Sequence, residues 1–345
     1  MTNYRRTQVI ATLGPASDKG AGLSDLLDTQ ADFIRLNMAH HSQTYYTDII
    51  AKIRQWKELK NTDHPKILID LAGSKIRVQQ LTSPLILEVD DDIIISKKEI
   101  DSPHKAIIVT GDFEFIRKIG EGRIFIHDGK IELETIEILT SFSLKAKVVR
   151  GGIIESRKGV NFPGVELKLI PFSEKDKSDL VFALHQGADC IAHSFVQTEK
   201  DYTIFENIMQ NENIRVPILA KIETVSSVDN LEEIIKTYDG ILIARGDLGV
   251  ETTMEKVPLV QKKATRLATK YAKPIFIATQ LLDSMRESET PTRGEINDVA
   301  SAIFSGVSGL VLTDETAVGR HPAKVVKQLQ RIIDTIENDI ECKNI

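Results

Sequence analysis

The stretch Pro217-Ile-Leu-Ala-Lys-Ile-Glu223 is an apolar run of strand length that ends in charged residues, and Tyr238-Asp-Gly-Ile-Leu-Ile-Ala-Arg-Gly-Asp247 repeats this pattern. Side chains alternate between the faces of a strand, so Lys221 and Glu223 point the same way. A strand-end Asp247 on a neighbouring run can then join them. Paired carboxylates bind Mg²⁺ when substrate oxygens and water complete its shell, and a nearby lysine can neutralise charge on a substrate oxygen. The pattern indicates an enzyme.

Apolar, β-branched runs of this kind occur eight times, and amphipathic stretches with helical spacing lie between them. The runs are 7–13, 33–38, 66–70, 189–195, 217–223, 240–247, 274–280 and 309–315. The helical stretches include 45–59, 174–185, 226–237, 257–271, 293–304 and 322–336. Strands that alternate with helices predict a parallel sheet, and eight of them favour a closed (β/α)8 barrel, a TIM barrel, over an open sheet.

The alternation breaks between residues 74 and 169, where Val and Ile alternate with polar residues in short pieces such as Asp92-Ile-Ile-Ile-Ser96. Turn signals at Thr110-Gly-Asp112 and Asp128-Gly129 separate these pieces, and the segment is predicted to be an all-β insertion after the third strand. We therefore expect residues 1–73 and 170–345 to form the barrel domain. Residues 74–169 would form a lid domain that closes over the catalytic face and excludes water.

Composition places the chain among ordinary folded proteins, since 41% of its 345 residues are hydrophobic and 27% are charged. The net charge of −6 is spread without long runs of one sign, which argues against a nucleic-acid partner. No apolar stretch of about 18 residues occurs, so we expect no membrane segment. Cys190 and Cys342 are too few for a metal knuckle or a disulfide framework, and a reducing cytoplasm is the expected location.

Polar side chains collect where the predicted strands end. In a (β/α)8 barrel those carboxyl ends face the active site. The residues in question are Arg35, Asn37, Asp70, Ser194, Lys221, Glu223, Arg245, Asp247, Thr279, Gln280, Thr313 and Glu315. We expect the active site among them.

Seven motifs, in order along almost the whole chain, resemble those of the pyruvate kinase family. They are Arg35-Leu-Asn-Met-Ala-His40, Lys158-Gly-Val-Asn-Phe-Pro-Gly164, Ala220-Lys-Ile-Glu223, Ala244-Arg-Gly-Asp-Leu-Gly-Val-Glu251, Ala278-Thr-Gln-Leu-Leu-Asp-Ser-Met285, Pro291-Thr-Arg-Gly-Glu295 and Glu315-Thr-Ala-Val-Gly319. The resemblance implies a (β/α)8 barrel with a β-barrel lid inserted after strand three. It also implies phosphoryl transfer from phosphoenolpyruvate to ADP, giving ATP and, after protonation of the enolate, pyruvate. The implied cofactor is Mg²⁺ or Mn²⁺.

The same resemblance implies roles for individual residues. Glu223 and Asp247 would hold the divalent metal, and Lys221 would stabilise charge on the transferring phosphoryl group. The residues implied around phosphoenolpyruvate are Arg35 and Arg77 as phosphate clamps, the backbone of Gly246 and Asp247 for the carboxylate, and Thr279 with Glu315 as a proton relay. Those implied around ADP or ATP are Pro15, Asn37, His40, Arg77 and Lys158. Two departures lie on the nucleotide and proton-relay side, since the usual Gly after His40 is His41, and the usual Ser-Gly before Glu315 is Thr313-Asp314.

A further departure concerns K⁺, which many members of the family require. Where the family has a Glu near the K⁺ site this chain has Lys75, and where it has a Ser ligand the chain has Ala39. An ammonium group can stand where K⁺ would otherwise sit. We therefore expect that Lys75 substitutes for K⁺ and that K⁺ is not required.

The sequence ends after the eighth predicted barrel helix, whereas the family commonly has a C-terminal α/β domain that binds sugar-phosphate effectors. We expect no activation by fructose 1,6-bisphosphate, and a homodimer through barrel helices. Two alternative functions stay open: a Mg²⁺-dependent lyase or aldolase acting on a related 2-oxo acid, and a catalytically silent pyruvate-kinase-like binding protein. The phosphate clamps Arg35 and Arg77 disfavour the first alternative. Retention of Lys221, Glu223 and Asp247 disfavours the second, because such groups add little to barrel stability.

Overall fold

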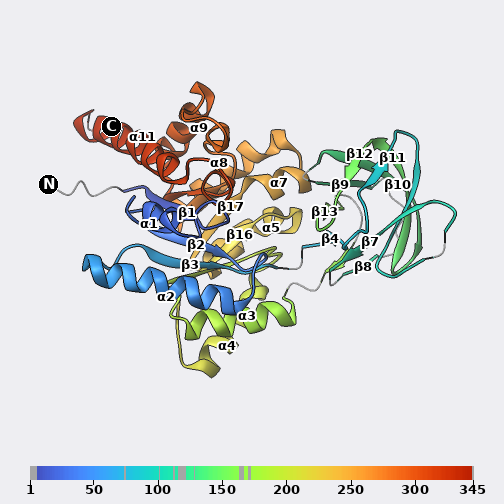
Figure 1. Cartoon of the computed structure of the whole chain (residues 1–345), viewed down its shortest axis with the longest axis horizontal. Helices are drawn as coiled ribbons and strands as arrows, with labels where there is room; N and C mark the ends of the chain where they lie inside the picture. Colours follow the sequence, from blue (N-terminus) through green and yellow to red (C-terminus); the bar gives the residue numbers. More distant parts are fainter. Residues whose placement is uncertain are drawn as a thin grey trace. The chain divides into compact units, whose positions relative to one another are not determined.

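The structure is a computed structural model, and it describes residues 6–73, 75–100, 102–111, 113–115, 122–127, 129–162, 167–169 and 172–343. The chain divides into two compact units (Figure 1). The first contains Met1–Ala72, Glu174–Gly246 and Pro258–Ile345, and the second contains Gly73–Ser173 and Asp247–Val257. The lid boundaries at 74 and 169 stay a prediction. Ser74, Asp112, Asp128 and the Pro163-Gly164 end of one motif lie outside the described residues.

The first unit is built on a closed barrel of eight parallel strands, which confirms the predicted (β/α)8 architecture. In chain order the strands are β1 (Gln8–Thr12), β2 (Phe33–Asn37), β3 (Lys66–Asp70), β15 (Cys190–His193), β16 (Ile218–Ile222), β17 (Gly240–Ala244), β18 (Ile275–Ala278) and β19 (Gly309–Leu312). Each strand pairs with the next, and β1 pairs with β19 to close the ring. Apolar side chains such as Ile10, Leu68, Leu219, Leu242 and Phe276 form one buried cluster of the unit.

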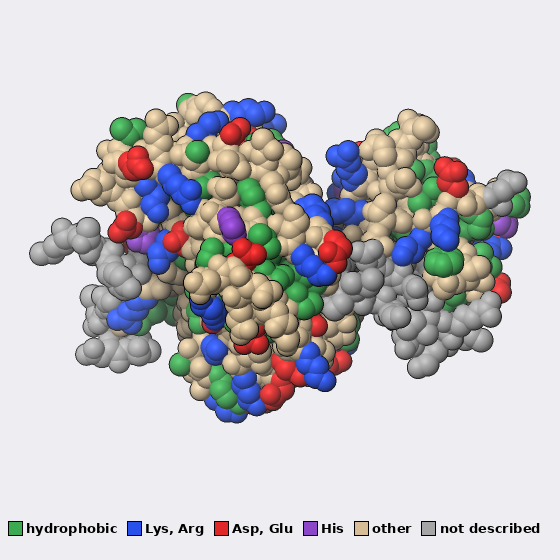
Figure 2. Space-filling view, turned by 90° about the horizontal axis from the view of Figure 1, so that it is seen from below, with side chains coloured by type: hydrophobic (Ala, Val, Ile, Leu, Met, Phe, Trp, Pro, Cys, Tyr) green, Lys and Arg blue, Asp and Glu red, His purple; other side chains and the backbone are tan. Residues whose placement is uncertain are grey.

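Helices of the first unit lie outside these strands, with α2, α3 and α4 on one side and α9 and α11 on the other (Figure 1). The α-helices of the chain are α1 (Ala21–Leu27), α2 (Gln43–Lys60), α3 (Glu174–His185), α4 (Tyr202–Glu212), α5 (Val225–Asp229), α6 (Leu231–Thr237), α7 (Arg245–Glu251), α8 (Val257–Lys270), α9 (Arg293–Phe304), α10 (Asp314–Ala317) and α11 (Pro322–Lys343). Short 3₁₀ turns are η1 (Glu199–Asp201), η2 (Met254–Lys256) and η3 (Asp283–Arg286). On the face in Figure 2, Lys and Arg side chains are interspersed with Asp and Glu. The described residues contain no helix that is both long and apolar enough to cross a membrane.

Several predicted elements differ from the structure: the predicted strand 309–315 ends at Leu312 because α10 begins at Asp314, and two others differ for reasons of hydrogen bonding. The predicted helix 226–237 is broken into α5 and α6, because the Asn230 side chain donates to the carbonyls of Ser226 (2.9 Å) and Gln197 (3.2 Å) at the break. The predicted strand 240–247 ends at Ala244. Beyond it the Gly246 N–H donates to Thr279 Oγ1 at 2.8 Å, which takes it out of the strand ladder as α7 begins.

The amino-terminal ends of the barrel strands share a hydrogen-bond motif that occurs four times. In each case the side chain of the residue before one strand accepts a hydrogen bond from the backbone N–H of a residue in the preceding barrel strand. The backbone N–H of the accepting residue donates in return to the carbonyl of that strand residue. The pairs are Asp32 with Val9, Asp189 with Ile67, Asp239 with Ile218, and Ser308 with Ile275, at side-chain distances of 2.7, 2.8, 2.8 and 3.1 Å. The motif precedes β2, β15, β17 and β19, which are alternate strands, and so satisfies an N–H group in the first two residues of each of the others.

The second unit is all-β, as predicted. Its strands are β4 (Arg77–Val78), β5 (Leu85–Leu87), β6 (Asp92–Ser96), β7 (Lys105–Thr110), β8 (Phe113–Phe115), β9 (Arg123–Ile126), β10 (Ile131–Thr140), β11 (Ser143–Arg150), β12 (Gly152–Ile154), β13 (Val160–Asn161) and β14 (Leu167–Leu169). Seven of them form one sheet in the order β13-β9-β10-β11-β6-β7-β4. An antiparallel bridge between Arg77 and Gly159 brings β4 beside the residue that precedes β13, so the sheet curls into a nearly closed barrel.

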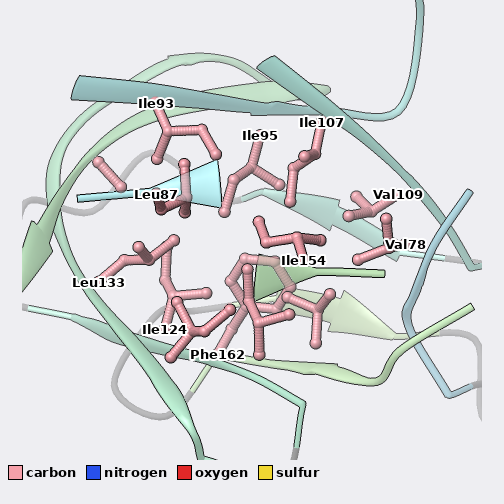
Figure 3. Close-up of a cluster of buried hydrophobic side chains, with 14 of the residues drawn as sticks. Val78, Leu87, Ile93, Ile95, Ile107, Val109, Ile124, Leu133, Ile154 and Phe162 are labelled. Carbon is pink, nitrogen blue, oxygen red and sulfur yellow. The ribbon is translucent and has the colours of Figure 1, made fainter. Parts of the chain in front are cut away.

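The interior of this second barrel is aliphatic. Figure 3 shows Ile93, Ile95, Ile107, Leu133 and Phe162 pointing toward one another, and all of them are at most 4% exposed. In β10 the inward Ile131 and Leu133 alternate with the polar Glu132 and Glu134, the period-two pattern seen in the sequence, whereas in β6 the residue between Ile93 and Ile95 is the buried Ile94. This unit therefore has a hydrophobic core of its own.

We predict that Asp32→Ala lowers the free energy of unfolding by about 1–2 kcal/mol, because the buried Val9 N–H loses its acceptor. Urea unfolding followed by circular dichroism measures the change. Asp32→Asn keeps an acceptor oxygen at the same place and is the matched control, expected to lose less. An alanine variant as stable as the wild type would contradict the role given to the four-fold motif.

Candidate active site

Four charged side chains near the carboxyl ends of β2, β3 and β16 form a continuous chain of contacts. Arg35 donates from Nε and Nη2 to Oδ2 of Asp70 at 2.7 and 2.6 Å. Lys221 Nζ lies 3.3 Å from Oδ1 of Asp70 and 2.9 Å from Oε1 of Glu223. All four are at most 9% exposed, so two cations and two carboxylates balance one another away from water.

Hydroxyl groups fix the two cations of this chain. Arg35 Nη1 donates to Thr12 Oγ1 at 2.9 Å, and Lys221 donates to Ser194 Oγ at 2.8 Å. The Ser194 hydroxyl in turn donates to the Leu71 carbonyl at 2.7 Å. Sequence reasoning placed Ser194 among the strand-end polar residues but missed Thr12. The available signal for Thr12 was a hydroxyl at the end of an otherwise apolar strand.

Neighbouring charges keep Asp70 and Lys221, the two inner members of this series of contacts, ionised. Burial by itself would raise the pKa of Asp70, but the charges of Lys221 and Arg35 outweigh it and hold that pKa below its ordinary value. Burial would lower the pKa of Lys221, but Asp70 and Glu223 raise it above its ordinary value. Lys221 therefore carries a permanent positive charge at neutral pH.

Glu223 is held from two sides. Its Oε2 accepts the N–H of Phe195 at 2.8 Å, and its Oε1 contacts Lys221. Phe195 itself has φ +57°, in the left-handed region where residues with a Cβ are uncommon. The turn after β15 is thus shaped so that a backbone N–H reaches this carboxylate.

Thr279 directly follows β18 in a strained backbone conformation, with φ +72°, and Gln280 comes next at φ +55°. A β-branched residue in the left-handed region costs about 1–3 kcal/mol, and such strain persists only where neighbours hold it. Arg245 does so by donating to the Thr279 carbonyl from Nη2 (2.7 Å) and Nε (3.1 Å), while Nη1 binds Asp298 at 2.7 Å. The Thr279 hydroxyl accepts the Gly246 N–H, which leaves its own proton available. Sequence reasoning gave Arg245 no role.

Glu315 is fully buried and its carboxylate binds backbone. Oε2 accepts the Thr313 N–H at 2.7 Å, and Oε1 accepts the N–H groups of Leu281 and Leu282 at 3.2 and 3.4 Å. Within the described part of the chain no hydrogen bond joins Glu315 to Thr279. The structure thus shows Glu315 anchoring the loop that follows Thr279, and its part in a proton relay stays a prediction.

The predicted nucleotide residues of the first unit lie on the loops that follow β1 and β2, which are neighbouring strands. Pro15 and His40 are exposed, and Asn37 ends β2. Asn37 Oδ1 accepts the Ala39 N–H at 3.1 Å, and the Asn37 carbonyl accepts the Tyr46 hydroxyl. These bonds fix the start of the β2–α2 loop.

In the second unit, Lys75 Nζ contacts Asp247 Oδ1 at 2.5 Å. Gly159 permits the approach of this lysine, because a Cβ at that position would lie 2.9 Å from Lys75 Cε. Arg77 Nη1 donates to the Arg157 carbonyl at 3.2 Å. Lys158 pairs with Glu155 at 3.1 Å, and both line a hollow of about 340 Å³ in this unit.

Carboxylates that could hold a metal occur singly rather than in clusters. Among residues 6–343, excluding the gaps given above, no group of three or more His, Cys, Asp or Glu could hold an ion. Glu223 contacts the ammonium of Lys221 in the first unit, and Asp247 contacts that of Lys75 in the second. Carboxylate oxygens suit Mg²⁺ or Mn²⁺ when substrate oxygens and water supply the remaining ligands. The donor chemistry fits such an ion.

Comparison with known proteins identifies relatives across nearly the whole chain. The family model for the pyruvate kinase barrel domain matches residues 4–326. A pyruvate kinase of Corynebacterium glutamicum is 38% identical over 338 residues, which cover 97% of this chain and 70% of that protein. A pyruvate kinase of Thermotoga maritima is 35% identical over 98% of this chain and 72% of its own length, and one of Geobacillus stearothermophilus is 36% identical over 99% and 58%.

Proposed function

Because the chain belongs to the pyruvate kinase family, we propose that it transfers the phosphoryl group of phosphoenolpyruvate to ADP, giving pyruvate and ATP. The observation that carries this proposal is the buried Lys221 ammonium, held by Asp70, Ser194 and Glu223 at the carboxyl end of the barrel. A fixed positive charge at that position suits a reaction in which negative charge moves between phosphoryl and enolate oxygens.

Lys221 does its work because it is charged and shielded from water. In a low-dielectric site a pre-oriented cation stabilises developing charge far more than water does, and no reorganisation is needed during the reaction. Arg35, whose guanidinium is oriented by Asp70 and Thr12, would hold the phosphoryl oxygens together with Arg77. These two arginines favour phosphoenolpyruvate over an unphosphorylated 2-oxo acid.

Glu223 and Asp247 are the residues that would hold the divalent cation, Mg²⁺ or Mn²⁺. When bound, the cation supplies a Lewis acid for the enolate and phosphate oxygens. Thr279 would relay a proton from water to the enolate carbon, giving its own proton and regaining one from the water, since its hydroxyl accepts the Gly246 N–H and keeps its own proton for donation. The resemblance implies that the backbone N–H groups of Gly246 and Asp247 bind the substrate carboxylate; the Gly246 N–H donates to Thr279 Oγ1 in this structure, and the role toward the carboxylate stays a prediction.

We further propose a homodimer through barrel helices and a cytoplasmic location. Three large apolar side chains on α8 and α9 are exposed, namely Leu259 (69%), Phe304 (65%) and Ile296 (38%), and burial against a second copy would remove them from water. Cys190 is buried, and burial raises the pKa of its thiol to about 12, as suits an unreactive core thiol.

The dimer is tested by sedimentation equilibrium. We expect the wild type at micromolar concentration to sediment with twice the chain mass, and a Leu259→Glu, Phe304→Glu double variant to sediment as a monomer. A wild type that stays monomeric up to about 50 micromolar would have a dimer Kd weaker than that concentration, and this result would refute the proposal.

For the reaction itself, we predict that Lys221→Met lowers kcat by about 10² to 10³ or more, because charge stabilisation in the transition state is lost. A coupled assay with phosphoenolpyruvate, ADP and Mg²⁺ measures this. The thermal midpoint of the variant controls for folding, since removing Lys221 leaves Asp70 and Glu223 with one cation fewer. Absence of turnover in the wild type with any nucleoside diphosphate would overturn the proposed function.

Lys75 supplies the positive charge that K⁺ provides elsewhere in the family, and its contact with Asp247 at 2.5 Å supports this. We predict full activity in tetramethylammonium buffer without K⁺. Lys75→Glu should lose most activity in that buffer and regain part of it in KCl, because the carboxylate then has a monovalent cation to balance it. Strong activation of the wild type by KCl would be the contrary result.

A further inference from the structure

We propose that His41 is a substrate-binding residue of the nucleotide site, and that its imidazole ring is a stacking surface for the nucleobase of the acceptor diphosphate. The inference rests on the proposed function and extends it to a residue where this chain departs from the family motif. The usual residue after His40 is glycine, which offers no surface at all. Here the position carries a ring.

The ring of His41 has one face covered and belongs to a small aromatic cluster. Its centroid lies 4.1 Å from that of Tyr45 with the planes 25° apart, a stacked arrangement. Tyr46 meets His41 edge-on at 6.0 Å and Tyr45 edge-on at 5.1 Å. His41 is nevertheless exposed, whereas Tyr46 is buried. The cluster therefore presents a supported ring to solvent.

Asp18 holds the cluster from the loop that follows β1. The Tyr45 hydroxyl donates to Asp18 Oδ2 at 2.6 Å. Burial, followed by the hydrogen bond and charge of Asp18, raises the pKa of Tyr45, so the phenol stays protonated and keeps donating. Asp18 is only 3% exposed, and its other oxygen, Oδ1, is buried without a hydrogen-bond partner among the described residues. Burying a carboxylate with one unbonded oxygen costs free energy. What Asp18 provides in return is a fixed position for Tyr45.

The β2–α2 loop is held at other points as well. Lys175 on α3 donates to the Met38 carbonyl at 3.0 Å, and the Tyr46 hydroxyl donates to the Asn37 carbonyl. Ser42 caps α2 by accepting the Tyr45 N–H at 3.4 Å. The stacking surface is thus ordered before any ligand arrives, which lowers the entropy cost of binding.

The surroundings identify the ligand chemistry. His41 directly follows His40, and Asp18 lies on the loop that carries Pro15, so the cluster joins two loops to which the proposed function assigns the nucleotide. An exposed aromatic ring can stack on a base of any kind, because every base has a π-face. The expected ligand is therefore a nucleoside diphosphate acceptor whose base stacks on the His41 ring, with modest discrimination among bases.

The test compares His41→Gly, which restores the family residue, with His41→Phe, which keeps a ring. We expect His41→Gly to raise the KM for ADP about fivefold or more, the low end of base stacking, with the KM for phosphoenolpyruvate unchanged. His41→Phe should rescue the affinity for ADP. Ribose 5-diphosphate, which has the same sugar and diphosphate but no base, should show the same KM in wild type and His41→Gly. Calorimetric titration of ADP into the Mg²⁺-loaded protein gives a second readout that needs no turnover.

Two results would overturn the proposal. One is a wild-type KM and affinity for ADP in His41→Gly. The other is a parallel rise of the KM for ADP and for ribose 5-diphosphate, which would mean that the ring shapes the loop and not a base contact. His104→Gly, at an exposed histidine of the second unit, is the matched control and should change neither value. A wild type without turnover would defeat the proposed function, and the titrations with ADP would still decide the role of His41.

Discussion

The alternation of charge along Arg35, Asp70, Lys221 and Glu223 is the constraint on which the site of the first unit depends. An isolated buried ion in such a place would cost several kcal/mol, and each of these is tolerable only because its neighbour has the opposite sign at 2.6 to 3.3 Å. The barrel supplies those distances, since parallel strands in register bring the residues of β2, β3 and β16 to one end. As a result, Lys221 is charged and largely shielded from solvent.

Near these four charged residues, unusual backbone conformations orient functional groups. Phe195 and Thr279 both adopt positive φ, and both lie at turns where the chain leaves a strand. At the first, a backbone N–H reaches Glu223, and at the second, Arg245 and Gly246 bind the carbonyl and hydroxyl of Thr279. Strain of this kind is stabilised by fixed partners and leaves functional groups in one orientation. The residues of the four-fold motif at the opposite end of the barrel have no positive φ, and their Asp and Ser side chains bond to the backbone of the neighbouring strand.

Much of the fold could be predicted because periodicity is a local property of the chain. The eight apolar runs and the insertion of alternating Val and Ile follow from which face of a strand is buried, and the strands β3 and β6 match their predicted ranges. The ends of elements were less predictable. Asn230 breaks one helix by donating to Gln197, and Gly246 leaves one strand by donating to Thr279. The periodicity of the surrounding sequence does not reveal these distant partners.

The sequence by itself determined the barrel, the all-β insertion, and the kinds of charged residue at the strand ends, because hydrophobic spacing and residue chemistry are written in the order of amino acids. Only the tertiary structure decided which of those residues meet. It brought Thr12 to Arg35, tied Glu315 to the backbone of Leu281, gave the Gly246 N–H to Thr279, and stacked His41 on Tyr45. The physical reason is that hydrogen bonds and ion pairs form between atoms about 3 Å apart, and that proximity is set by the packing of distant segments.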